Sequence, residues 1–292
     1  MSWDDQKIFL AVIETGSLSA AARALGVAQP TVRARLETLE HRIGASLFTR
    51  SVRGLVPTDQ ALALADHARA MALASDAFER AAAAPADEVA GVVRLSVSDF
   101  VGVEVIPPML RRLRDRHPHI AIELALSNAA ADLLRQEADI AVRMEPPRQQ
   151  ALVARKVGAI PLGLFAHRDY VAHRGMPQTV ADLAAHEMIG SDRTRADLAL
   201  GEALVPGENR KAFRFRSDSH PAQLAAARAG LGIAVAQRPI ALTDPQLVAV
   251  LPELIVATLD TWIVTHEDLR RLPRVRATFD HLVAEFTAII AG

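Results

Sequence analysis

Residues 17–58 constrain the fold more than any other part of this chain of 292 residues. Four apolar side chains recur there at positions i, i+4, i+7 and i+11: Val32, Leu36, Leu39 and Ile43. At about 100° per residue these positions form one narrow stripe, which predicts an α-helix that packs on this side only. The opposite surface and its flanks carry short polar and cationic side chains of the kind that reach base edges and phosphates: Pro30, Thr31, Arg33, Ala34, Arg35, Thr38 and Arg42. This composition is typical of a recognition helix for duplex DNA.

Two further helices are predicted upstream. Their apolar faces are formed by Ile8, Phe9, Val12 and Ile13 in the first and by Ala20, Ala21, Ala24 and Leu25 in the second. Gly26 suits the left-handed residue that ends a helix, and Pro30 is tolerated in the first turn of the next one. We therefore expect a three-helix core with a tight turn at residues 27–30.

A hairpin-like wing is predicted at residues 47–58, with Arg50 and Arg53 around a glycine turn at Gly54. We expect these two arginines to contact the DNA backbone or the minor groove. Residues 23–53 contain six arginines against Glu37 and Glu40, a local surplus that supports the DNA-binding interpretation. The alternative is that the arginine-rich helix is only a solvated helix.

The segment ETGSLSAAARALGVAQPTVRARLETLEHRIGASLFTR, residues 14–50, resembles the N-terminal domain of the LysR-type transcriptional regulators. The resemblance implies that Gln29 and Pro30 contact double-stranded promoter DNA, with positions 33 and 34 equivalent by place only. Ala28 stands where the family's serine would cap the helix, which forfeits about 1 kcal/mol. Arg33-Ala34-Arg35 replaces the family's Ser-Arg-Gln, so the positive charge is moved by one residue.

Whole-chain composition excludes several other classes of function. The net charge of −1 argues against a general polyanion binder, and the absence of cysteine excludes thiol redox sensing, disulfides and thiolate metal sites. The N-terminus MSWDDQKIF lacks the apolar run of an export signal, and no stretch approaches the ~18 consecutive apolar residues of a membrane span. We therefore expect a cytoplasmic protein without a membrane partner.

A long helix is predicted from Thr58 to about Ala84, where glycine and proline are absent. Its stripe of mostly small residues comprises Leu62, Ala65, Ala68, Ala72 and Ser75 or Phe78. Because such a helix cannot bury its stripe alone, we expect it to mediate dimerisation. The alternative is a helix that packs on its own regulatory domain. The resemblance implies self-association as a dimer or a dimer of dimers.

Strands alternate with helices after residue 90, which predicts parallel sheets. The expected strands are 92–97, 120–126, 139–143, 213–216 and 262–266, and the expected helices are 105–116, 132–137, 222–229 and a final one bearing Phe279, Leu282, Val283, Phe286 and Ile290. Two α/β lobes result, and the segments LLRQEADIAVR and ARAGLGIAVA resemble landmarks of the family's periplasmic-binding-protein-like effector domain.

The expected fold class is thus α+β and multidomain. It combines an N-terminal winged helix-turn-helix at residues 1–58, a linker helix and hinge at 59–90, and a two-lobed α/β effector domain at 91–292. Lobe I is expected at about 91–161 and 267–292, and lobe II at about 162–266.

A ligand of such a fold is expected where strands end and helices begin, because free backbone N–H groups and helix dipoles favour polar or anionic groups there. The candidate effector-binding residues are Ser98, Asp99, Phe100, Asn128, Arg143, Asp218, Ser219 and His220. Arg143 favours an anionic metabolite, whereas Asp99 and Asp218 would repel one. The alternatives are that Ser98, Asp99 and Asp218 only cap helices, that Asn128 forms a turn, and that Arg143 pairs with Glu145 or Asp139.

No enzyme motif is complete. His186-Glu187 and His266-Glu267 lack the second histidine of a zincin, and Gly230-Leu231-Gly232 lacks the third glycine of a dinucleotide site. We expect no catalytic residue, no metal and no cofactor. The predicted function is a LysR-type DNA-binding transcriptional regulator whose promoter binding is modulated by a small-molecule effector. The alternatives are a DNA-binding scaffold without a ligand and a solute-binding protein.

Overall fold

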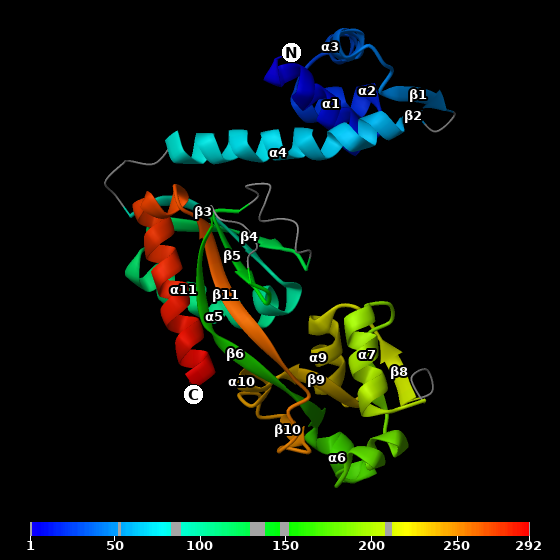
Figure 1. Cartoon of the computed structure of the whole chain (residues 1–292), viewed down its shortest axis with the longest axis vertical. Coiled ribbons are helices and arrows are strands. Elements are labelled where there is room, and N and C mark those ends of the chain that lie inside the picture. Colours follow the sequence, from blue (N-terminus) through cyan, green and yellow to red (C-terminus); the bar gives the residue numbers. More distant parts are fainter. Residues whose placement is uncertain are drawn as a thin grey trace. The chain divides into compact units, whose positions relative to one another are not determined.

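The computed structural model describes residues 2–51, 54–82, 89–128, 138–146, 152–207 and 212–291. Within these ranges the chain forms two compact bodies, one containing residues 2–82 and the other lying within residues 89–291 (Figure 1). Each body has its own hydrophobic core.

The first body consists of three short helices, a two-stranded hairpin and a long helix. These are α1 (Trp3–Thr15), α2 (Leu18–Leu25), α3 (Gln29–Ile43), β1 (Phe48–Ser51), β2 (Gly54–Pro57) and α4 (Asp59–Ala82). Ser2 and Asp5 form a capping box at the start of α1, and Ser17 caps α2 by accepting from the Ala20 N–H at 3.1 Å. Gly26 ends α2 with φ +66°, the left-handed conformation that the sequence predicts there.

The helical stripe predicted for residues 32–43 is confirmed. Val32, Leu36 and Leu39 are buried in the core of the first body and Ile43 packs against it. In α2 the prediction is wrong at one position, because Ala24 is exposed and Ala22 is buried instead. At about 100° per residue, Ala21, Leu25, Leu18 and Ala22 fall within one arc of about 100° that faces the core, and Ala24 lies about 60° outside this arc.

The second body contains a single mixed sheet. Its strands are β3 (Gly91–Val97), β4 (Ile120–Leu126), β5 (Ile140–Arg143), β6 (Leu152–His167), β7 (Met188–Gly190), β8 (Phe213–Arg216), β9 (Ile233–Gln237), β10 (Leu247–Val250) and β11 (Ala257–His266). In the described residues the strand order is β4-β3-β5-β11-β6-β9-β7-β8, and β10 pairs with β6.

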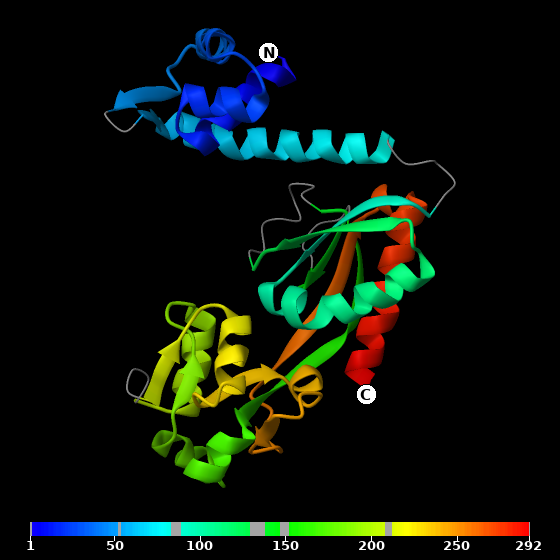
Figure 2. The ribbon, with the colours of Figure 1, turned by 180° about the vertical axis from the view of Figure 1, so that it is seen from behind.

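Two α/β lobes share this sheet. In lobe I, β3 pairs in parallel with β4 and β5, as the sequence predicts. In lobe II, β7 pairs in parallel with β8 and β9, and β7 is a strand that the sequence analysis did not predict. The long strands β6 and β11 are antiparallel to each other and run through both lobes (Figures 1 and 2). The predicted strand 262–266 is the end of β11, and it pairs with β5 of lobe I.

Helices connect the strands of the second body. They comprise the π-helical turn η1 (Val101–Val105), α5 (Ile106–Arg116), α6 (Arg168–Arg174), η3 (Val180–Ala185), α7 (Arg195–Leu204), α9 (His220–Arg228), α10 (Arg238–Ala241), η4 (Leu269–Arg271) and α11 (Pro273–Ala291). As predicted, α11 buries Phe279, Leu282 and Phe286 in the core with β3 and α5. The helix predicted at 132–137 lies outside the described residues.

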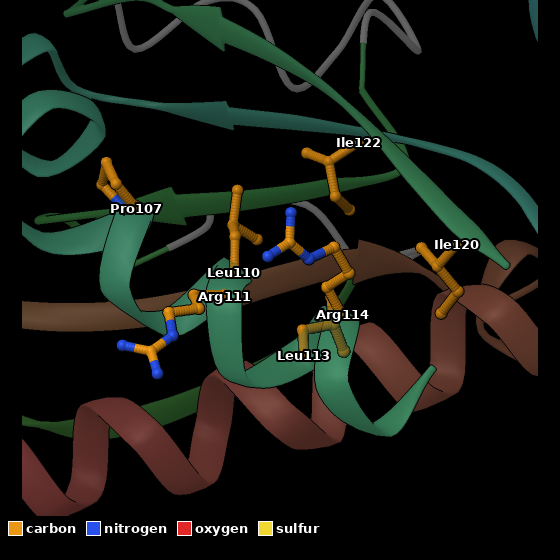
Figure 3. A pocket seen from close by; sticks show the side chains of 7 residues that line it. All are labelled: Pro107, Leu110, Arg111, Leu113, Arg114, Ile120 and Ile122. Carbon is orange, nitrogen blue, oxygen red and sulfur yellow. The ribbon is translucent and has the colours of Figure 1, made fainter. Parts of the chain in front are cut away.

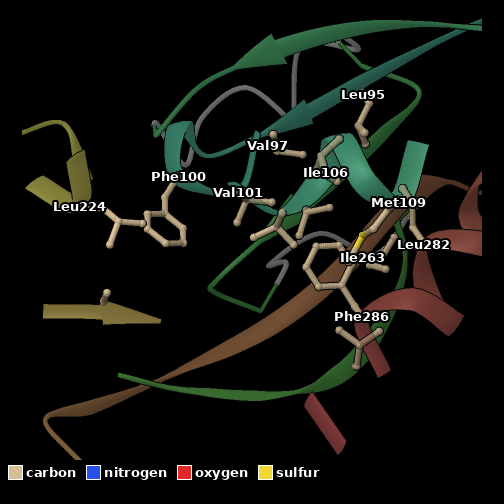
Figure 4. Close-up of a cluster of buried hydrophobic side chains, with 14 of the residues drawn as sticks. Leu95, Val97, Phe100, Val101, Ile106, Met109, Leu224, Ile263, Leu282 and Phe286 are labelled. Carbon is tan, nitrogen blue, oxygen red and sulfur yellow. The ribbon is translucent and has the colours of Figure 1, made fainter. Parts of the chain in front are cut away.

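One hydrophobic core joins the two lobes. Phe100 and Val101 of lobe I belong to the same cluster as Leu224 and Ala227 of α9 in lobe II (Figure 4). A relative movement of the lobes at this place would expose apolar surface, at a cost of roughly 25 cal/mol per Å².

None of the helices within the described ranges is both long and apolar enough to cross a bilayer.

Candidate nucleic-acid interface and effector site

The exposed face of α3 presents most of the side chains that the sequence assigns to DNA. Pro30, Thr31, Arg33, Ala34 and Thr38 are exposed, and Gln29 and Arg35 are half-buried. Arg33 forms no ion pair with any described residue, so its guanidinium is available to an external acceptor. This face combines short side chains with a cation, as contacts to base edges require.

Arg35 has a partner inside the first body. Its Nη1 lies 3.3 Å from Asp4 Oδ2 and 3.5 Å from Asp5 Oδ1, and Arg42 lies 3.7 Å from Asp5 Oδ2. Hydrogen bonds from Ser2 lower the pKa of Asp5, with smaller contributions from Arg35 and Arg42. Arg35 therefore ties α3 to the start of α1, a contact that the sequence analysis did not predict.

The N-terminus of α3 is uncapped. Ala28 occupies the N-cap position with extended backbone angles (φ −73°, ψ 141°), and its side chain forms no cap hydrogen bond. The backbone is thus already in the conformation in which serine would accept from an N–H of the first turn.

We expect Ala28→Ser to raise the free energy of unfolding of the first body by about 1 kcal/mol, because it supplies the missing cap. Chemical denaturation in a Trp262→Phe background measures this, since Trp3 of α1 is then the only tryptophan. Ala34→Ser on the exposed side of α3 is the control and should be slightly destabilising. Equal effects of both changes would contradict the capping argument.

The wing is the antiparallel hairpin β1–β2, which is anchored on the helical core. The Leu55 N–H donates to the Gly16 carbonyl at 3.0 Å, and the rings of Phe9 and Phe48 lie 5.8 Å apart. Glu40 accepts from the backbone N–H groups of Leu47 and Phe48, at 2.7 and 3.3 Å. The Glu40 carboxylate is therefore occupied by the start of the wing. Arg50 is exposed on β1, and Arg53 lies outside the described residues.

Three of the predicted effector residues lie together where the two lobes meet. On lobe I, Asn128 Oδ1 accepts from the Asp99 N–H at 3.1 Å, and Asp99 Oδ1 accepts from the Phe100 N–H at 2.7 Å. On lobe II, His220 begins α9, and its Nδ1 lies 3.9 Å from Asp99 Oδ1. The structure therefore brings Asp99, Asn128 and His220 together at one interlobe junction.

Two other candidates, Ser98 and Asp218, accept hydrogen bonds from the backbone. Ser98 Oγ accepts from the Val101 N–H at 3.4 Å, and Asp218 Oδ1 accepts from the N–H groups of residues 192, 193 and 194 at 2.9–3.2 Å. These hydrogen bonds, the one from Arg193 foremost, lower the pKa of Asp218. Ser219 is the N-cap residue of α9 but its side chain forms no cap hydrogen bond. Phe100 is buried in the shared core.

Arg143 is folded back onto lobe I. It donates to the carbonyl oxygen of Ser96 at 3.0 Å, to Ser96 Oγ at 2.7 Å and to the Val142 carbonyl at 3.0 Å. Both Nη atoms thus have protein acceptors, which weakens the argument for an anionic effector at this residue.

Asp197 of α7 is the functional candidate that sequence reasoning missed. Its Oδ2 lies 2.9 Å from His220 Nε2 and accepts from Ser191 Oγ at 2.7 Å. The buried side chain of Gln223 donates in turn to Ser191 Oγ at 3.2 Å. No sequence signal marked α7, so nothing pointed to Asp197.

The carboxylates around His220 favour its charged form. The hydrogen bond with Asp197 raises the pKa of His220 above its ordinary value of 6.5, with smaller contributions from Asp99 and Asp218. The same bond is the main cause of the lowered pKa of Asp197. Protonated His220 therefore has a negative partner on each lobe.

We expect the junction to stabilise the fold below the unfolded-state pKa of His220 and to lose that contribution as the pH rises through the higher folded-state pKa. The difference in Tm between the wild type and His220→Gln should therefore shrink between about pH 6 and pH 8. Thermal unfolding at several pH values measures it, with His173→Gln on exposed α6 as the control. A difference independent of pH would contradict a charged His220.

A groove on lobe I holds none of the predicted effector residues. It has a volume of about 320 Å³ and lies between α5 and the edge strand β4 (Figure 3). Its lining consists of Pro107, Leu110, Arg111, Leu113, Arg114, Ile120 and Ile122.

The comparisons with known proteins follow the same division of the chain. Residues 3–62 match the bacterial regulatory helix-turn-helix protein of the lysR family, and residues 86–287 match the LysR substrate binding domain. The chain belongs to the LysR family of transcriptional regulators. This confirms the resemblance seen in the sequence, the winged and two-lobed fold class, and the function as a LysR-type DNA-binding regulator with a substrate-binding domain.

Relatives of this LysR-family chain are regulators rather than enzymes. An HTH-type transcriptional regulator of Xanthomonas campestris pv. campestris (strain 8004) is 31% identical over 66% of this chain and 56% of its own length. The probable HTH-type transcriptional regulator LtrA of Klebsiella pneumoniae is 28% identical over 99% of this chain and 96% of its own. Full-length CbnR in complex with its target DNA has a TM-score of 0.68 at 20% identity, over 98% of this chain and all of that one, and shows the shared fold.

Proposed function

We propose that this LysR-family regulator reads promoter DNA through the exposed face of α3, supported by the wing. The observation that carries the proposal is the set of exposed short and cationic side chains on α3, Thr31, Arg33 and Ala34 among them. Thr31 and Arg33 contact base edges, whereas Arg50 and Arg53 contact phosphates or the minor groove. Arg35 keeps α3 in place through Asp4 and Asp5.

Self-association through α4 is the second part of the proposed function. The first half of α4 packs on its own helical core, where Ala61, Ala65 and Ala68 are buried. The predicted dimerisation stripe is therefore partly used within the chain. Met71 and Phe78, which are 42% and 75% exposed, lie seven residues apart on one side of α4. We assign them to contact with the same helix of a second copy, in a dimer or a dimer of dimers.

The proposed effector response centres on the interlobe junction. A small molecule that contacts His220 together with Asp99 or Asn128 touches both lobes and changes their mutual arrangement by its differential affinity. A cationic or neutral hydrogen-bond donor suits the carboxylates of Asp99 and Asp197 better than an anion does.

The test is DNA binding by purified full-length variants. Genomic fragments bound at near-physiological salt define the operator. We expect Arg50→Ala to weaken binding to operator and random DNA alike and to reduce the salt slope by about 1, because it removes one phosphate contact. Thr31→Ala and Arg33→Ala should change the preferred base at one position, by about 1–3 kcal/mol.

Arg69→Ala on α4 is the control for these variants, because Arg69 pairs with Asp66 outside α3 and the wing. It should leave affinity and preference unchanged. Equal losses on operator and random DNA for Thr31→Ala, Arg33→Ala and Arg50→Ala would overturn the assigned roles.

A further inference from the structure

A second cavity lies inside lobe II, between α7 and the edge strand β8. Its volume is about 230 Å³, and it is lined by Ser191, Asp192, Asp197, Leu198, Gly201, Phe213 and Arg216. At about 30 Å³ per molecule of liquid water, this space corresponds to roughly eight waters or to a ligand of about ten non-hydrogen atoms. The cavity therefore suits a small metabolite.

The lining offers charges of both signs. Arg216 comes from the end of β8, and Asp192 and Asp197 come from the loop after β7 and from α7. Arg216 Nε lies 3.5 Å from Asp192 Oδ1, longer than a good hydrogen bond, and both side chains are about one-third exposed. Arg216 Nη1 also donates to the Phe213 carbonyl at 3.3 Å, and Arg193 Nε lies 3.3 Å from Asp192 Oδ2. Exposed ion pairs of this kind contribute little, so a ligand with its own charges can compete for Arg216 and Asp192.

One carboxylate oxygen of Asp197 takes part in neither of the hydrogen bonds of this side chain. Both of its hydrogen bonds, from Ser191 and with His220, involve Oδ2. No described residue donates to Oδ1. A carboxylate oxygen without a donor, in a residue that lines a cavity, is a place for the N–H groups of a ligand.

The remainder of the lining is apolar. Phe213 is buried beneath the cavity, and Leu198 and Gly201 contribute one side from successive turns of α7. Gly201 has no side chain, so the helix backbone itself borders the cavity at this position, beside the apolar side chains of Leu198 and Phe213.

We propose that this cavity binds an α-amino acid with an aliphatic side chain. The ammonium group donates to Asp197 Oδ1 and Asp192, the carboxylate accepts from Arg216, and the side chain contacts Leu198 and Phe213. Because Asp197 also holds His220, the bound amino acid borders the interlobe junction. The site lies within lobe II and goes beyond the proposed effector response at that junction.

The experiment measures binding of each of the twenty L-amino acids to the full-length protein by thermal shift and calorimetry. We expect saturable binding of an aliphatic member such as L-leucine and a rise in Tm that grows with its concentration. 3-Methylbutylamine lacks the carboxylate and 4-methylpentanoate lacks the ammonium group. Each should bind about tenfold or more weakly, because one charged partner in the protein is left without its ligand group.

Two variants test the location of the site. Arg216→Gln removes the carboxylate partner, and Gly201→Leu fills the cavity without altering any charge; each should weaken binding by about tenfold or more. Arg214→Gln is the matched control, since Arg214 lies two residues earlier on β8 and is outside the lining. It should bind as the wild type does.

Absence of binding by every amino acid would overturn the proposal, and so would binding that survives both Arg216→Gln and Gly201→Leu. Stronger binding of the amine or the acid than of the zwitterion would also overturn it. These measurements require no DNA. Failure of the proposed DNA-binding function is therefore seen separately, as absence of operator binding by the same preparation.

Discussion

Gly232→Ala should lower the free energy of unfolding of the second body by about 4 kcal/mol, the largest loss that we expect from adding one methyl group. Gly232 has φ +153°, which L side chains rarely adopt, and a Cβ there would lie 2.2 Å from the Glu187 carbonyl oxygen. That oxygen accepts from the Ile233 N–H at 2.8 Å, where β7 meets β9. Alanine therefore adds backbone strain and also pushes the two strands apart.

Gly207→Ala separates the two causes. Gly207 also has a positive φ, +74°, but no atom lies within 4 Å of the position that a Cβ would occupy there. This control should cost only about 1–2 kcal/mol, from the left-handed conformation. Denaturation in a Trp3→Phe background follows the second body, because Trp262 of β11 is then the only tryptophan. Equal losses for both glycines would show that the Glu187 contact is not decisive.

The DNA-binding body was predictable because its determinants are local. The stripe of Val32, Leu36 and Leu39 reflects packing within one helix, and Gly26 marks the end of its neighbour. Arg35 shows that local patterns do not predict contacts between helices. Its position on α3 matches a DNA contact, but its partner Asp4 lies 31 residues earlier, on a helix whose orientation no local pattern specifies.

The effector region was predictable only in outline. Strand ends and helix starts singled out Asp99 and His220, whose side chains lie close together where the lobes meet, because parallel strands of one lobe end at a common edge. The sequence could not show which of these side chains accept hydrogen bonds from the backbone rather than face a ligand, because this depends on loop geometry. Asp218, for example, accepts from the backbone N–H groups of residues 192–194. Glu104 and Arg228 are 124 residues apart, and neither stood out in the sequence.

Arg228→Met should destabilise the second body by about 3 kcal/mol, because Arg228 pairs with two carboxylates at the contact between the lobes. On lobe I, Glu104 Oε1 and Oε2 accept from Nη1 and Nη2 at 2.9 and 2.8 Å. On lobe II, Asp244 Oδ2 accepts from Nε at 2.7 Å. Both carboxylates raise the pKa of Arg228, the Glu104 hydrogen bond most strongly, so methionine leaves two negative charges with little access to water.

Removal of the uncompensated charges should rescue this variant. In the Trp3→Phe background, adding Glu104→Gln and Asp244→Asn to Arg228→Met should recover more than half of the lost free energy, because neutral amides cost less to bury than unpaired carboxylates. A loss below about 1 kcal/mol would place the bridge among ordinary surface ion pairs.

The loss of stability at acidic pH tests the same ion pairs of Arg228 with Glu104 and Asp244. Hydrogen bonds from Gln246 and then from Arg228 lower the pKa of Asp244, so its stabilising contribution is present above its unfolded-state pKa and is lost as the pH falls through the lower folded-state pKa. The wild type should therefore lose stability in acid faster than Arg228→Met does. Glu104 and Arg228 adjoin Val105 and Ala227 in the chain, and both of these belong to the core shared by the lobes. An effector that separates the lobes at this place must therefore disrupt the ion pairs as well as the core.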